Sequence, residues 1–162
     1  MQKITLLYLA YFCLSGCVSV QLSPSKILKA KDINLNAPEK PFEKIDSNQV
    51  DQAWQSKKTG NTIAYLSECR DDKDEPLTST EAEALKSLNQ VKIISSQAGS
   101  YNDRESLYTN ATGFVDGVAV ETHLLHFKKN GCLYSLMYLG RQKLLKSEIN
   151  YFEKFKEGFK AP

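Results

Sequence analysis

Cysteine and histidine are the residues of this chain with the most distinctive chemistry, and the spacing of the four cysteines divides them into two pairs. Cys13 and Cys17 lie close together in the stretch YFCLSGCVSV, whereas Cys69 and Cys132 lie far apart in the rest of the chain. A close pair of this kind could hold a metal, form a disulfide or belong to a processing signal. The residues that precede the pair decide between these possibilities.

The N-terminal stretch has the organisation of an export signal. Residue 3 is a lysine, and residues 4–14 are almost wholly apolar, a run too short for the roughly 20 residues of a membrane-spanning helix. A positive first region, a short apolar run and small residues at its end are typical of a cleavable signal peptide. The run ends in an aliphatic residue, two small residues and a cysteine: Leu14, Ser15, Gly16 and Cys17.

These four residues resemble the lipobox of bacterial lipoproteins, which type II signal peptidase recognises. The resemblance implies that residues 1–16 are removed by cleavage between Gly16 and Cys17, and that the Cys17 thiol carries a diacylglycerol and its new amino group an acyl chain. Several acyl chains on one residue hold a protein stably to a bilayer. Because Val18 follows, with no aspartate to retain the protein at an inner membrane, we expect an outer-membrane anchor facing the periplasm. An ordinary signal peptide with a chance cysteine is the alternative.

Cys69 and Cys132 are the cysteines that remain after this processing. A single pair in an exported, oxidising setting predicts a disulfide, and two separate buried thiols are the alternative. Cys69 closes one expected strand and Cys132 opens another, so the two ends meet only if those strands are antiparallel neighbours. Neither cysteine has a second ligand at zinc-binding spacing, and we expect no metal site.

The mature chain has the length of one domain with a tether. Residues 17–45 are polar, contain three prolines and lack sustained periodicity, which predicts a lipidated cysteine followed by a flexible tether. Residues 46–162 are expected to form the globular domain. Loss of Lys3 lowers the formal net charge from +2 to +1, and no basic or aromatic motif points to nucleic acid.

The globular region opens with signals for a hairpin and a helix. Strand-like residues flank a turn at 59–61, and the second strand is expected at 62–68, where β-branched and aromatic residues are frequent. A short helix is expected after Pro76, and residues 78–81 or 80–83 offer a capping box at its start.

The second half of the chain predicts a meander and a closing helix. Strand-like segments are found at 91–99, 104–114, 118–127 and 132–140. The turns are expected at Asp116-Gly117 and Asn130-Gly131, and the strand at 132–140 is apolar on both faces, which predicts a central strand covered on both sides. Residues 141–159 have helical periodicity. The order hairpin, helix, three-stranded meander, helix gives an α+β fold with helices packed on a largely antiparallel sheet.

Several short motifs between Ala53 and Phe159 carry a resemblance: Trp54, YLSEC, GFVDGV, GCLYSLMY and the phenylalanine-rich end. In these motifs the chain resembles small bacterial lipoproteins of unassigned function. More distantly it is similar to the PsbP-like α/β/α sandwich, shared by a photosystem II extrinsic subunit and a Ran-binding nuclear import factor. Ser135 stands where relatives often have aspartate. Members of this fold mostly bind proteins, so the resemblance implies a binding domain.

The remaining reactive side chains do not predict catalysis. His123 and His126 are three positions apart on one strand, point to opposite faces and cannot share a metal. The sequence has no G-x-S-x-G elbow and no phosphate-binding glycine loop, so we expect no catalytic residues and no cofactor. The acidic run at 68–75 lacks the pattern of a calcium loop and is expected to be solvated. Six aromatic residues could line a ligand groove, although core packing is expected: Trp54, Tyr65, Tyr101, Tyr108, Tyr134 and Tyr138.

Together these features predict a membrane-anchored lipoprotein of the cell envelope with a non-catalytic binding or scaffold domain for an envelope protein partner. A small-ligand carrier and an envelope enzyme acting on peptidoglycan or lipid are the alternatives. A deep pocket with convergent polar groups would favour a carrier or an enzyme, and a flat apolar patch would favour a partner site.

Overall fold

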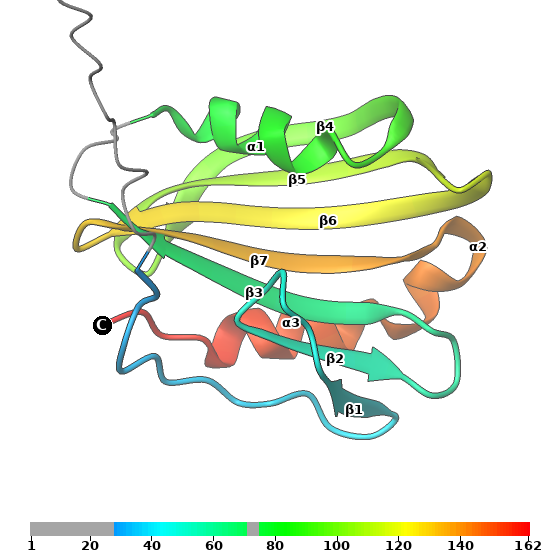
Figure 1. The fold of residues 1–162 in the computed structure, drawn as a ribbon, viewed down its shortest axis with the longest axis horizontal. Helices are drawn as coiled ribbons and strands as arrows, with labels where there is room; N and C mark the ends of the chain where they lie inside the picture. Colours follow the sequence, from blue (N-terminus) through cyan, green and yellow to red (C-terminus); the bar gives the residue numbers. More distant parts are fainter. Residues whose placement is uncertain (1–27, 71–74) are drawn as a thin grey trace, which may run out of the picture.

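The computed structural model describes residues 28–70 and 75–162, so the expected signal peptide, the lipobox and Cys17 lie outside the described residues. Seven strands form one sheet in the order β1-β2-β3-β7-β6-β5-β4, in which all neighbouring strands are antiparallel (Figure 1). The strands are β1 Phe42–Ile45, β2 Gln52–Ser56, β3 Thr62–Cys69, β4 Asn89–Tyr101, β5 Arg104–Val115, β6 Val118–Lys129 and β7 Cys132–Arg141. The helices are α1 Leu77–Leu85, α2 Gln142–Leu145 and α3 Ile149–Gly158. The expected α+β fold is confirmed. No helix in the described ranges has the length and apolarity needed to cross a membrane.

Tight turns join four strands, β4 to β7, into a meander. The expected turns at Asp116-Gly117 and Asn130-Gly131 are present, and all four residues have the positive φ that two-residue hairpin turns require. The expected three-stranded meander is one strand too short, because β4 joins β5 through Asn102-Asp103. These two residues also have positive φ, at 52° and 61°, although neither is a glycine.

The helices lie on opposite faces and over different halves of the sheet (Figure 1). Phe152, Phe155 and Phe159, from α3 and the residue after it, pack on the large aromatic cluster over β2, β3, β7 and β6. Leu85 and Leu88 on the α1 side pack on a smaller cluster from β5 and β6. Because neighbouring strand residues point to opposite faces, the two helices cover different side chains of the same strands.

The C-terminal helical region is broken, whereas the sequence predicted one helix over residues 141–159. A 3₁₀ turn, Lys146–Glu148, separates α2 from α3. The break places the buried Glu148 carboxylate beneath the β2–β3 turn, where it accepts hydrogen bonds from Ser56 Oγ (2.9 Å), Asn61 Nδ2 (3.1 Å) and Thr59 Oγ1. A tertiary contact that periodicity does not encode thus decides where the helix is interrupted.

The prediction of a flexible tether over residues 17–45 is wrong from residue 28 onward. Leu28 forms an antiparallel bridge with Cys69, Asn34 forms another with Lys160, and residues 42–45 are strand β1. Three half-buried side chains of this segment pack against the aromatic core: Ala30, Ile33 and Leu35. The segment lacks periodicity because isolated bridges and single side chains attach it to the domain. The globular unit therefore begins before residue 46.

Candidate functional site

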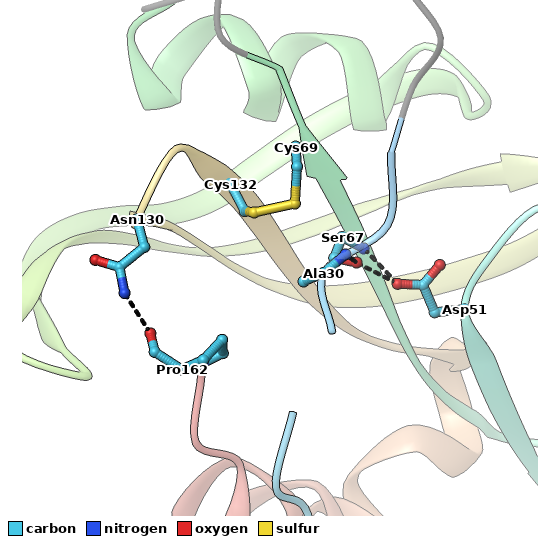
Figure 2. Close-up of a disulfide and its surroundings, with 7 residues drawn as sticks. All are labelled: Ala30, Asp51, Ser67, Cys69, Asn130, Cys132 and Pro162. Carbon is cyan, nitrogen blue, oxygen red and sulfur yellow. Dashed lines mark hydrogen bonds between the residues drawn. A yellow bond between two sulfur atoms is a disulfide. The ribbon is translucent and has the colours of Figure 1, made fainter. Parts of the chain in front are cut away.

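Cys69 and Cys132 form a disulfide, the first of the two alternatives that the sequence left open (Figure 2). The two residues are direct partners in the antiparallel pairing of β3 with β7, with their Cα atoms 4.0 Å apart. The Cys69 N–H points away from β7 and donates to Leu28 O (2.8 Å). Cys69 and Cys132 are therefore a close, non-hydrogen-bonded pair of the β3–β7 ladder. Neither sulfur is available as a nucleophile or a metal ligand.

Polar contacts around this bridge hold the N-terminal segment in place (Figure 2). Asp51 Oδ2 accepts hydrogen bonds from the Ser67 backbone N–H (2.9 Å) and hydroxyl, and the Ser67 hydroxyl accepts one from Ala30 N (2.9 Å). Lys29 forms an ion pair with the other Asp51 oxygen at 2.8 Å. These contacts make this end of the sheet a structural anchor rather than a reactive site.

The α1 side of the sheet carries an open apolar hollow of about 550 Å³, here called the trough. One wall is α1 with the residues that follow it, and the other is the segment 46–50 between β1 and β2. The floor is formed by side chains from four strands: Ala53, Ala64, Leu66, Leu124, Leu133, Met137 and Leu139. Most of the side chains on this floor are apolar.

The floor exists because β7 is apolar on both faces while only one face is fully covered. Tyr134, Leu136 and Tyr138 are fully buried on the α3 side. Met137 is half-buried on the other side, and Leu139 is 37% exposed. β7 is the central strand, as predicted, but its second face is only partly covered, and the prediction of full cover on both sides is wrong. The physical reason is that α1 has only nine residues and packs mainly on β5 and β6.

Acidic side chains surround the apolar floor. Asp46 lies on the 46–50 wall, Glu83 on the α1 wall, and Glu68 at the end near the disulfide. No lysine or arginine among the described residues lines the trough. Glu83 forms an exposed ion pair with Lys86, which is weak because both groups are solvated, and the half-buried Glu68 lies 3.7 Å from half-buried Arg70. The rim thus carries three carboxylates beside an apolar surface, two of them paired with cations of the same chain.

Buried polar groups attach α1 to the sheet. Neither predicted capping box forms, since the helix begins after Pro76 without a side-chain cap. The Glu81 carboxylate is directed inward instead and accepts hydrogen bonds from Ser96 Oγ (2.7 Å) and Thr109 Oγ1. Fully buried His126 lies on the same face, with its Nδ1 2.8 Å from Ser135 Oγ, and this burial lowers its pKa to about 4.

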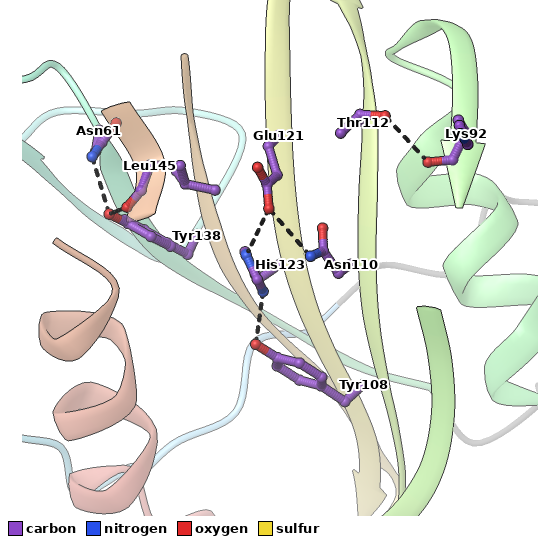
Figure 3. Close-up of polar contacts among 9 residues, drawn as sticks. All are labelled: Asn61, Lys92, Tyr108, Asn110, Thr112, Glu121, His123, Tyr138 and Leu145. Carbon is purple, nitrogen blue, oxygen red and sulfur yellow. Dashed lines mark hydrogen bonds and ion pairs between the residues drawn. The ribbon is translucent and has the colours of Figure 1, made fainter. Parts of the chain in front are cut away.

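His123 lies on the opposite face, as the spacing of the two histidines predicts. Figure 3 shows its ring between Tyr108 and Glu121. Tyr108 OH lies 2.8 Å from His123 Nδ1, while Nε2 lies 3.3 Å from Glu121 Oε1, which also accepts a hydrogen bond from Asn110. Burial lowers the pKa of His123 and raises the pKa of Tyr108 to about 12. At neutral pH both are uncharged, so Tyr108 donates to Nδ1 and His123 donates to Glu121.

Most of the six aromatic residues belong to the core, as expected, whereas Tyr101 and Tyr108 also line a hollow of about 350 Å³ beside α3. Trp54, Tyr65, Tyr134 and Tyr138 are buried in the aromatic cluster, and Tyr101 and Tyr108 pack at its edge. Of the acidic run, Asp71, Asp72 and Asp74 lie outside the described residues. Within the described ranges, no group of three or more histidine, cysteine or acidic side chains has a metal-binding arrangement.

Sequence reasoning missed the trough. The signal was present in the two apolar faces of residues 132–140 together with the short helical segment after Pro76. One helix of that length cannot cover the apolar face of several strands.

Comparison with known proteins supports the fold assignment. No protein-family model matches this sequence, and no curated protein is significantly similar to it. LpqN of Mycobacterium tuberculosis, described as involved in cell envelope biogenesis, is similar in structure with a TM-score of 0.64 and 11% identity, over 83% of this chain and 86% of LpqN. Cyanobacterial PsbP (CyanoP) from Synechocystis sp. PCC 6803 is similar with a TM-score of 0.60 and 13% identity, over 92% of this chain and 99% of CyanoP. The chain therefore has a PsbP-like α+β fold.

Proposed function

We propose that this protein is a lipid-anchored lipoprotein of the cell envelope whose domain binds an envelope protein partner and catalyses no reaction. Its anchor is Cys17, acylated after cleavage behind Gly16, in an outer membrane and facing the periplasm. The lipobox-like residues support the anchor, and the Cys69–Cys132 disulfide fits an oxidising compartment. The described role of LpqN, which has the same fold, is consistent with an envelope protein.

The trough is the observation that carries the binding role. Its floor holds apolar side chains from the centre of the sheet, where a closed sandwich would bury them completely. Contiguous apolar surface with a polar rim is typical of a site that another molecule covers. Burial of Leu139 and its half-buried neighbours in a complex would supply the hydrophobic driving force.

The groups near the trough support binding rather than chemistry. Its polar lining consists of hydroxyl and amide side chains and rim carboxylates, with no histidine or cysteine among the described residues. His123 and Tyr108 are hydrogen-bonded to each other on the opposite face. A small-ligand carrier is the second candidate, because the hollow of about 550 Å³ lies within the size range of ligand sites.

Site-specific photo-crosslinking in the native envelope tests this function. A photoreactive amino acid replaces Leu139 in the trough or Leu144 outside it, and both native residues are 37% exposed. We expect position 139, and not position 144, to give one protein adduct that mass spectrometry identifies. Adducts of equal yield at both positions, or lipid and small-molecule adducts alone at position 139, would overturn the partner-binding role.

A further inference from the structure

The trough has a shape, a backbone environment and a charge that together specify its occupant. Building on the function proposed above, we infer that the trough binds an amphipathic α-helix of the partner, whose apolar stripe lies on the floor and whose flanks carry lysine or arginine.

The backbone environment selects a helix over an extended segment. The floor is the face of the sheet, and the N–H and C=O groups of β3, β7 and β6 are already paired with each other in the ladders. An extended peptide laid on this face would bury its own polar groups without partners, which is costly. A helix satisfies its backbone internally and presents only side chains to the floor.

The dimensions of the trough fit a helix of three to four turns. Between Leu133 and Leu139 the floor follows six residue steps of β7, a length of about 20 Å at about 3.4 Å per residue. A helix of about 13 residues has that length. Placed beside α1 at the usual interaxial distance of about 8–10 Å, it would extend the single-helix layer on this side across β7 and β3.

The rim specifies the charge of the helix. Glu83 lies on one wall and Asp46 on the other, and Glu68 adds a third carboxylate at one end, with Lys86 beside Glu83 and Arg70 beside Glu68. A helix with basic residues on both sides of its apolar stripe places a cation near each wall. The same rim repels anionic lipid headgroups, so it disfavours an acidic lipid as the occupant.

Synthetic peptides and the full lipidated chain, held in zwitterionic phosphatidylcholine nanodiscs, provide the test. One peptide of about 14 residues has leucines at helical spacing with flanking lysines. A second has the same composition in scrambled order, and a third has glutamate in place of lysine. Fluorescence anisotropy measures binding, and the signal from empty nanodiscs is subtracted. We expect the first peptide to bind at least about tenfold more tightly than the other two.

Matched variants assign that binding to the trough. Leu139→Lys is expected to lower the affinity for the lysine peptide about tenfold or more. Leu144→Lys, at a residue of equal exposure, is expected to leave that affinity unchanged. Asp46→Lys is expected to lower the affinity for the lysine peptide and to raise the affinity for the glutamate peptide. Glu105→Lys changes an exposed acid outside the trough and is expected to alter neither affinity.

Three results would overturn the inference: equal binding of the scrambled peptide, equal binding of the glutamate peptide, or extended-type ¹³Cα shifts in the bound lysine peptide. Failure of this inference is distinguishable from failure of the proposed function. If position 139 crosslinks a partner through a segment without helical structure or basic flanks, the inference is wrong and the binding function stands. If position 139 crosslinks only lipid, both are wrong.

Discussion

Tyr138 and Leu139 are consecutive residues of β7, yet Tyr138 is fully buried and Leu139 is 37% exposed. Tyr138 stacks on Phe152 of α3 and donates a hydrogen bond to Leu145 O (2.8 Å), whereas Leu139 lies on the floor of the trough. The sandwich is therefore closed on the α3 side and half-open on the α1 side. This asymmetry separates the residues that stabilise the domain from those that are available for binding.

Substitutions on β7 are expected to reveal this separation. Leu136→Ala removes a fully buried side chain and should lower the free energy of unfolding by about 2–5 kcal/mol. Leu139→Ala should lower it by less than about 1 kcal/mol, because its side chain is partly solvated in the free protein. Urea denaturation measures both values. Equal losses would show that the trough floor is part of the core.

The disulfide is expected to stabilise the domain strongly. Cys69 and Cys132 are 63 residues apart, a loop for which the chain-entropy model gives about 4 kcal/mol as an upper value. The Cys69→Ala/Cys132→Ala double variant should therefore lose between about 2 and 4 kcal/mol in urea denaturation. Adding a reductant should destabilise the native protein and leave the double variant unchanged. A native protein indifferent to the reductant would contradict this account.

Local sequence signals predict the strands and two of the hairpins, since glycine at Asp116-Gly117 and Asn130-Gly131 marks positive φ directly. The Asn102-Asp103 turn lacks that mark. The pairing of Cys69 with Cys132 depends on the β3–β7 register, which local patterns leave open. Residues 28–41 escape prediction because their contacts are isolated bridges and single side chains.

The trough escapes prediction for a different reason. Apolar faces on residues 132–140 indicate burial, but they do not say whether the chain itself or another molecule supplies the cover. Only the placement of α1 over β5 and β6 shows that the chain leaves this face half-open.

Acid is expected to destabilise the domain through His126. Its pKa is about 4 in the folded state, against 6.5 for an ordinary exposed histidine, so the unfolded chain binds more protons between these pH values. Stability is thus fully present above pH 6.5 and falls as the pH drops toward 4, by on the order of 3 kcal/mol. Urea denaturation across this range should show a clearly smaller slope for His126→Gln, with a residual slope from His123, whose pKa is also lowered. An unchanged slope in His126→Gln would contradict the buried, neutral histidine.

The lipid anchor is expected to depend on one side chain. Cys17→Ser keeps the small size of the residue and removes the thiol that forms the thioether. Metabolic labelling with a radioactive fatty acid should mark the native protein and leave this variant unlabelled. Cys13→Ser serves as the matched control and should keep the label, since that residue leaves with the signal peptide. Persistent labelling of Cys17→Ser would refute the lipoprotein assignment.

The central claim is that the trough is a partner-binding site, and the most direct measurement is the yield of the protein adduct from a photo-crosslinker at position 139. Leu66→Lys places a charge on the same floor, whereas Glu105→Lys changes an exposed residue outside the trough. We predict that Leu66→Lys abolishes the adduct and that Glu105→Lys leaves its yield unchanged. An adduct that forms equally in both variants would show that the partner does not occupy the trough.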